Sequence, residues 1–195
     1  MSTTTTSSSS DAPFDASKIA GNAPLHVKQT LGNPIKWLEG LVAPEFKNAN
    51  FFGKAIYARL RVTEISVDKK VDEESKLEGR VIVETVVEED MLNGGGNIHG
   101  GCSAFLVDMC SAMSLNALSL ATTGKGNRSV SQAINMIYHS PAGWGDTLRL
   151  VNTSTTLGNR VQSCRTEIWN ATHHRLVASG THIKMSPSPP PKSNL

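Results

Sequence analysis

The chain has 195 residues, 38% of them hydrophobic, which suits one domain with polar ends rather than two domains. Its net charge is +2, and it has no basic stripe with interleaved aromatic residues, so we expect no nucleic-acid partner. Its three cysteines lack the spacing of a metal site, so we expect no bound metal and a reducing compartment.

The two ends of the chain differ in composition from its middle. Residues 1–25 are rich in Ser, Thr and Ala and lack the apolar core of a signal peptide, which predicts a disordered tail. Residues 186–195 are rich in proline and predict a second disordered tail. Residues 26–185 then form a single domain. We expect a cytoplasmic protein, with the mitochondrion and the peroxisome as alternatives, because the final Ser-Asn-Leu resembles a peroxisomal address without its basic residue.

The first part of this domain combines helical and strand patterns. Apolar residues recur at helical spacing over 26–46, and Asn33 before a proline is a plausible helix cap. Residues 55–67 alternate and predict a strand, and 79–88 predict a second one. The charged segment 68–78 between them predicts a solvated hairpin loop.

The central stretch, residues 93–124, organises the rest of the chain. Between Asp90 and Lys125 it holds one fully charged residue, Asp108, among small and apolar residues on all sides. This pattern predicts a long helix surrounded by its own protein, with one buried carboxylate. Asp108 and several serines argue against a lipid-exposed membrane span.

The start of this helix has a chemical use. Gly100 and Gly101 would open it, where the first backbone N–H groups lack partners and the helix dipole is positive. Such a helix end can polarise a carbonyl group, and Asp108 can act as a general base or a nucleophile. The structural alternative is a glycine-rich helix entry and an aspartate that bonds to backbone.

The spacing of these residues limits how they can cooperate. Gly100 and Asp108 are eight residues apart, or ~12 Å along a helix. A base and an oxyanion donor must both lie within ~3 Å of one reacting group. We therefore predict an obligate homodimer in which two antiparallel central helices share each active site.

Four strands follow the helix. They are predicted at 128–138, 147–156, 160–170 and 176–185, with a turn at 141–146. No long crossover helix separates them, so antiparallel pairing is expected. The fold class is therefore α+β, a curved antiparallel sheet wrapped around a long central helix.

Three sequence blocks resemble a known family. They are Asn-x-Gly-Gly-x-x-His-Gly-Gly from Asn93, then Leu-Val-Asp ending at Asp108, then Asn-Met-Ile-Tyr-His-Ser-Pro-Ala over 135–142. Their order resembles hotdog-fold acyl-CoA thioesterases of the phenylacetate-degradation type, most of all the small eukaryotic branch of thioesterase superfamily member 2. The resemblance covers about residues 51 to 185.

The resemblance implies a role for each matching residue. Asn93 and the backbone N–H of Gly100 would polarise the thioester carbonyl, and Asp108 of the partner chain would activate the attacking water. Ser131 would help to hold that water, and His99 would orient the loop. The family needs no metal and no cofactor, since coenzyme A is part of the substrate, and its homodimers pair into homotetramers.

Coenzyme A is placed less sharply by the resemblance. It would run along the segment that contains Tyr138, Ser140 and Pro141 and along the turn that contains Gly158 and Arg160. Candidate phosphate partners are Arg128, Arg160 and Lys184. Each of these cations can equally be a solvated charge at a strand end.

The expected activity is hydrolysis of fatty or aryl acyl-CoA to a free acid and coenzyme A. One alternative is a hotdog hydratase or dehydratase, which would need a histidine set against the substrate's Cα or Cβ, whereas His99 precedes the glycine turn. Another is a non-catalytic acyl-CoA-binding protein, which would have no need of a water-activating carboxylate. The remaining histidines, such as His182 on the last strand, lack the neighbouring cysteines of a zinc site.

Overall fold

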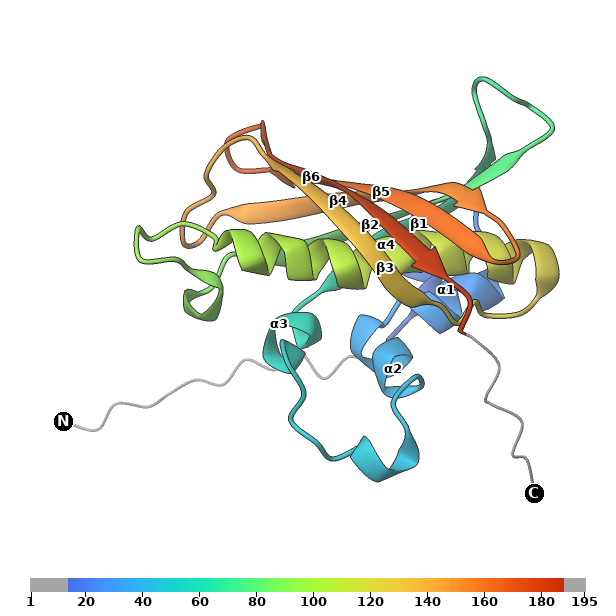
Figure 1. The fold of residues 1–195 in the computed structure, drawn as a ribbon, viewed down its shortest axis with the longest axis horizontal. Helices are drawn as coiled ribbons and strands as arrows, with labels where there is room; N and C mark the ends of the chain where they lie inside the picture. The colour runs from blue at the N-terminus through green and yellow to red at the C-terminus, as the bar shows by residue number, and fades with distance from the viewer. Residues whose placement is uncertain (1–13, 188–195) are drawn as a thin grey trace.

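The computed structural model describes residues 14–187 and consists of one curved sheet, one long helix and several short helices (Figure 1). The strands are β1 (Arg61–Lys69), β2 (Leu77–Val86), β3 (Val130–Tyr138), β4 (Thr147–Leu157), β5 (Val161–Asn170) and β6 (Arg175–Met185). They lie in the order β1-β2-β4-β5-β6-β3, and every pair is antiparallel. The α+β fold predicted from the sequence is confirmed.

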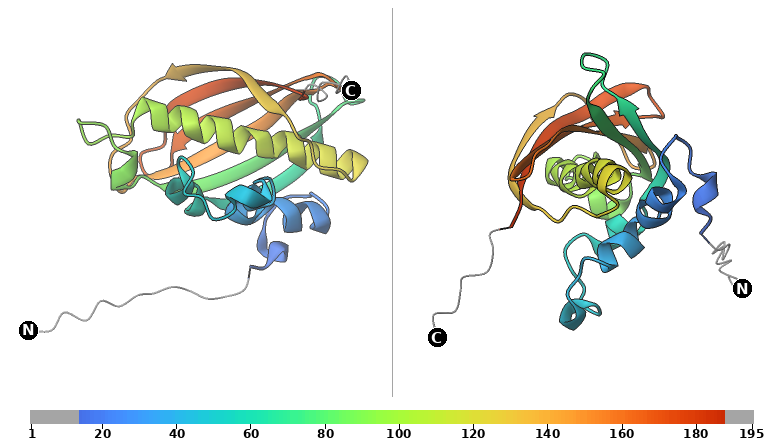
Figure 2. Two further views of the ribbon diagram at one scale, coloured as in Figure 1. Left: turned by 60° about the horizontal axis from the view of Figure 1, so that its bottom comes forward. Right: turned by 90° about the vertical axis from the view of Figure 1, so that its right-hand side faces the viewer.

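The long helix α4 (Gly100–Thr123) lies in the hollow of the sheet (Figure 2). Its inner face buries Leu106, Val107, Cys110 and Met113 completely, and their removal from water is the main stabilising contribution of the core. A Cβ at Gly79 of β2 would lie 2.3 Å from a backbone oxygen of α4, so only glycine allows the sheet to approach this closely. By length and composition α4 would qualify as a membrane span, but most of it is buried within the domain.

The N-terminal helices cover the side of α4 that faces away from the sheet (Figure 2). They are α1 (Leu25–Leu31), α2 (Pro34–Glu39) and α3 (Lys54–Ala58). Asn33 caps α2 as predicted, since its side-chain oxygen accepts the N–H of Lys36 at 3.1 Å. The strand predicted from residue 55 is wrong at its start, because 54–58 are helical and buried Tyr57 breaks the apparent alternation.

Part of the segment predicted as an N-terminal tail, residues 1–25, packs against the domain. Ala16, Ile19 and Ala23 are buried, and the segment from 16 to 23 lies along the outer edge of β1. The Ala20 N–H donates to the Thr63 carbonyl at 3.0 Å, and the Ala23 N–H donates to the Ile65 carbonyl. The predictions for residues 1–13, for 188–195 and for the final tripeptide fall outside the described residues.

The opposite edge of the sheet, formed by β3, is open. Within residues 14–187, β3 has β6 as its one neighbour, and its outer edge carries unpaired backbone groups over nine residues. Val130, Ile137 and Tyr138 on this strand are exposed. A long, apolar, open edge strand is a template for pairing with another chain.

Candidate active site

The glycine loop before α4 is held in place by Asn93. Its side-chain oxygen accepts the N–H of Gly95 at 2.9 Å and that of Asn97 at 3.2 Å. The Gly96 φ of +74° lies in the left-handed region, which glycine adopts without strain. Because the amide oxygen is occupied inside the loop, the Asn93 NH₂ group is left to donate to a bound molecule.

The first turn of α4 offers a second donor. His99 is the N-cap, and its Nδ1 accepts the Gly101 N–H at 2.8 Å, so a proton on Nε2 is the tautomer that this bond requires. The Gly100 N–H makes no hydrogen bond within the described part of the chain, while its carbonyl accepts from the Tyr138 hydroxyl at 3.0 Å. A free N–H at the positive end of a helix of 24 residues can stabilise a developing negative charge.

These groups surround one hollow of about 410 Å³, which we call the loop-end hollow. Its lining includes Asn93, Gly100, Tyr138, Ser140 and Pro141. Both predicted carbonyl-polarising groups and three of the five predicted coenzyme A contacts therefore come together in the folded chain.

Asp108 lies two turns further along α4 and forms a second cluster. Ser131 Oγ donates to Asp108 Oδ1 at 2.7 Å, and Lys184 Nζ donates to Ser131 Oγ at 3.2 Å. A β-bulge interrupts the pairing of β3 with β6 between Ser131 and Ala133, and bulges commonly re-aim side chains beside functional sites. The prediction that Asp108 is buried is wrong, because its side chain lies beside the open β3 edge and is 38% exposed.

His182 lies directly behind the carboxylate. Its Nε2 is 3.4 Å from Asp108 Oδ1, and its Nδ1 is 2.8 Å from the hydroxyl of Ser111. The imidazole is 0% exposed, and Nε2 has no hydrogen-bond partner at normal distance among the described residues. A ring with its proton on Nε2 would point that proton at Asp108 while Nδ1 accepts from Ser111.

Burial and charge set the protonation of this cluster. Burial, reinforced by the nearby Lys184 ammonium and opposed by Asp108, lowers the pKa of His182 to about 4, so the ring is neutral at pH 7. Burial also lowers the pKa of Lys184, and the Asp108 carboxylate opposes this shift. The His182 ring is therefore neutral where it meets Asp108, between α4 and the sheet.

The structure differs from the sequence analysis for two of these residues. Lys184 was a candidate phosphate partner at a strand end, but it is 6% exposed and bonds to Ser131. His182 was set aside as a poor metal ligand, yet it contacts the carboxylate. The signal was present in the sequence, because positions 178, 180, 182 and 184 alternate on the inward face of β6, where a histidine and a lysine interrupt an otherwise apolar set.

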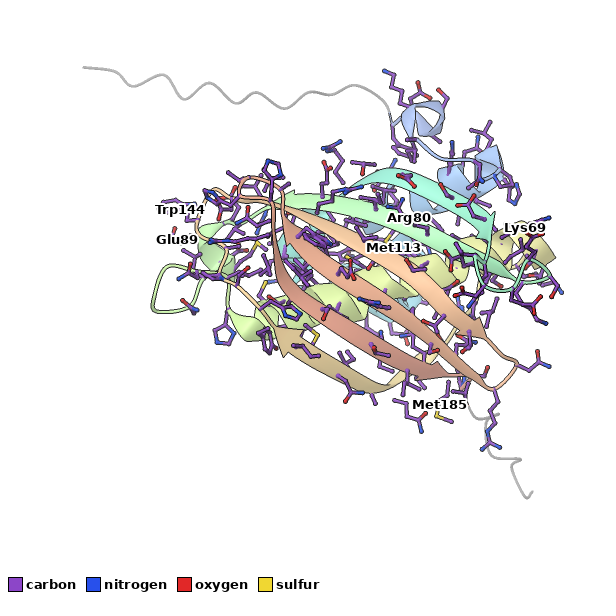
Figure 3. All side chains as sticks on the ribbon, turned by 90° about the horizontal axis from the view of Figure 1, so that it is seen from above. Lys69, Arg80, Glu89, Met113, Trp144 and Met185 are labelled. Atoms are coloured by element: carbon purple, nitrogen blue, oxygen red, sulfur yellow. The ribbon has the colours of Figure 1, made fainter. Side chains whose placement is uncertain are left out.

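Within one chain, the predicted coenzyme A contacts fall into two groups at opposite ends of the sheet. The loop-end hollow lies near Trp144, whereas Arg160 lies beside Met185, where β5 and β6 pair at their other end. Figure 3 labels Trp144 and Met185 at these two ends. No group of three or more His, Cys, Asp or Glu side chains that could hold a metal ion occurs among residues 14–187.

Known proteins are similar to this chain. Residues 95–177 match the family model of the thioesterase superfamily. Acyl-coenzyme A thioesterase 13 from Homo sapiens is 34% identical over 106 residues, which are 54% of this chain and 72% of the human protein.

Two solved structures share the fold. Thioesterase superfamily member 2 from Mus musculus matches with a TM-score of 0.58 at 24% identity, covering 80% of this chain and 95% of that one. A hypothetical thioesterase from Streptococcus pneumoniae, solved with coenzyme A, matches with a TM-score of 0.53 at 21% identity, covering 65% and 84%.

Proposed function

Because this chain belongs to the thioesterase superfamily, we propose that it hydrolyses acyl-coenzyme A to a free acid and coenzyme A. The observation that carries this proposal is the Asp108 carboxylate, bonded to Ser131 at 2.7 Å and partly open to solvent. A carboxylate held in this way can accept a proton from an attacking water. The relative from Homo sapiens bears the name of an acyl-coenzyme A thioesterase, which supports the substrate class.

We propose that each active site combines two copies of the chain. The Gly100 N–H and Asp108 lie ~12 Å apart along one helix, too far to act on the same carbonyl. Antiparallel pairing of β3 with a second copy, centred near Ile134, would set Ser131 of one copy beside Tyr138 of the other. Since Tyr138 bonds to Gly100 and Ser131 bonds to Asp108, such a dimer would complete two sites.

The chemical steps follow from these positions. The thioester oxygen would accept hydrogen bonds from the Gly100 N–H and the Asn93 amide of one copy. Asp108 of the other copy would take a proton from a water that Ser131 helps to hold, and the water oxygen would attack the carbonyl carbon. The C–S bond would then break, and the coenzyme A sulfur would leave with the proton from Asp108.

The contacts of His99 favour hydrolysis over hydration or dehydration. Its Nδ1 caps α4 by accepting from Gly101, and the ring is therefore engaged in holding the helix start. A hydratase would need a base facing the substrate's Cα or Cβ. The network of Ser131, Lys184 and His182 around Asp108 argues in the same way against a protein that only binds acyl-CoA, because simple binding needs no oriented carboxylate.

Loss of the carboxylate tests the proposal. Asp108→Ala should lower the rate of thiol release from acyl-CoA by ~10²–10⁴-fold, the usual contribution of a general base. The matched control is Asp72→Ala, which removes an exposed aspartate in the β1–β2 loop and should leave the rate unchanged. No thiol release by the unaltered protein from any acyl-CoA, or full activity of Asp108→Ala, would refute the proposal.

Mixed dimers test the sharing of the site. Asp108→Ala and Asn93→Ala should each be inactive, but their co-expression should restore about a quarter of the original activity. Half of the dimers would then be mixed, and each mixed dimer would hold one intact site of two. A site built within one chain would give no recovery, because every chain in the mixture carries a defect.

A further inference from the structure

A second cavity reaches Asp108 beside the start of β3. It lies between α4 and α2, has a volume of about 330 Å³, and is lined by both Asp108 and Ser131. We call it the α2 cavity. Trp37 and Leu38 of α2 face Met109 and Ala112 of α4, and the start of β3 also lines the cavity.

We propose that the α2 cavity binds the acyl chain of the substrate and that Trp37 limits the length of chain it accepts. The inference rests on the proposed function, since that function puts the reacting carbonyl carbon beside Asp108. A chain attached to that carbon can enter the α2 cavity directly. The thioester sulfur can then point to the loop-end hollow of the second copy, where Tyr138 and Ser140 offer polar contacts.

The walls of the α2 cavity suit an aliphatic chain. Trp37, Leu38 and Met109 are apolar and pack against the core cluster of the domain. Asp108 is the one carboxylate in the lining, and the cations Lys184 and Arg128 line it too. Methylene groups moved from water to such a surface gain about 25 cal/mol per Å² of apolar area buried.

Trp37 lies at the boundary between this cavity and an adjoining hollow of about 530 Å³. Asn116 and Arg128 line both spaces, whereas Gln29 and Lys36 line the adjoining hollow. Asn116 stands at the same boundary, and its side-chain oxygen accepts the N–H of Asn127 at 2.9 Å, which holds the loop after α4 in place. A chain that extends past Trp37 would therefore leave the α2 cavity and set methylene groups against Gln29 and Lys36.

The volume gives the expected length. At ~30 Å³ for each water-sized unit, 330 Å³ holds about eleven such units, and a methylene group is of similar size. Asp108 and Asn116 are eight residues apart on α4, which gives the cavity a length of ~12 Å. We therefore expect a medium-length acyl chain of about ten carbons to fill the cavity.

Binding of non-hydrolysable S-alkyl-coenzyme A thioethers, measured by calorimetry, tests this inference without depending on catalysis. For the unaltered protein, affinity should rise about fourfold for each methylene up to about ten carbons and then level off. The chain-length profile of kcat/KM for thiol release should break at the same point. A profile with no break, or a break unrelated to these walls, would overturn the inference.

Two substitutions should move the break in opposite directions. Trp37→Ala joins the two hollows and should shift it to longer chains, whereas Ala112→Phe fills the α2 cavity and should shift it to shorter ones. General damage to α2 cannot produce both shifts. Phe46→Ala removes an exposed aromatic side chain from the same N-terminal region and should leave the break in place.

The outcomes separate this inference from the proposed function. If the thioether profile breaks and moves as expected while no acyl-CoA releases thiol, the cavity binds acyl chains but the proposed hydrolysis is wrong. If thiol release depends on Asp108 while neither Trp37→Ala nor Ala112→Phe moves the break, hydrolysis stands and the assignment of this cavity is wrong.

Discussion

His182 should make the stability of the folded chain depend on pH. In the folded protein its pKa is lowered to about 4, against an ordinary value of 6.5 in an unfolded chain. Between these two pH values His182 is protonated in the unfolded chain but not in the folded chain, so the free energy of unfolding falls as the pH falls. The contribution is fully present above pH 6.5 and is lost progressively down to pH 4.

The two pKa values give the size of this effect. At pH 5 the difference in proton binding corresponds to about 2 kcal/mol of lost stability, and a fully buried ring needs no reduction for solvent screening. We expect His182→Gln to be less stable at pH 7.5, since it disturbs the bonds to Ser111 and Asp108. It should, however, lose about 2 kcal/mol less than the unaltered protein between pH 7.5 and pH 5.

Urea unfolding at both pH values, at one fixed protein concentration, measures this difference. With a slope of about 2 kcal/mol per molar urea, the midpoint of the unaltered protein should fall by about 1 M more than that of the variant. His174→Asn, an exposed turn residue whose φ of 52° asparagine tolerates, should behave like the unaltered protein. Equal losses in the unaltered protein and in His182→Gln would refute the reasoning.

Two further substitutions test the site and its assembly. Lys184→Met removes a charge-assisted bond to Ser131 that contributes about 1.5–3 kcal/mol, and it should lower kcat by about 10- to 100-fold. Lys184→Arg should recover part of this activity. A rise in KM alone would instead indicate that Lys184 contacts a coenzyme A phosphate. Ile137→Lys puts a charge on the open β3 edge and should give inactive protein that light scattering shows to be monomeric. Val71→Lys, in the β1–β2 loop, should leave the dimer and its activity intact. An active Ile137→Lys monomer would contradict the two-copy site.

Much of the fold and half of the candidate site could be predicted because their signals are local. A glycine run before a stretch with one charge indicates a helix start near Gly100, whatever packs around it. The alternating strands after the helix, joined by short turns, leave antiparallel pairing as the natural arrangement. These features depend on residues that are close together in the chain, so the sequence alone indicates them.

The remainder depends on contacts between residues far apart in the chain. His182 is 71 residues from Ser111, and the packing of β6 against α4 brings it to Ser111 and Asp108. The pairing of β6 with β3 sets Lys184 beside Ser131. Residues 54–58 are too short a window to tell helix from strand by apolar spacing. The exposure of Asp108 depends on the open edge of the sheet, which no local pattern indicates.

The two edges of the sheet limit how many chains can join by extending the sheet. A sheet that is open on both sides can add copies without end, as a filament does, whereas this chain closes one side with its own residues 16–23. When two copies pair through β3, the open edge of each copy is covered by the other, so growth along the sheet stops at two chains. A truncation that removed residues up to Ala23 would reopen the closed side and turn a self-limiting pair into a unit able to polymerise.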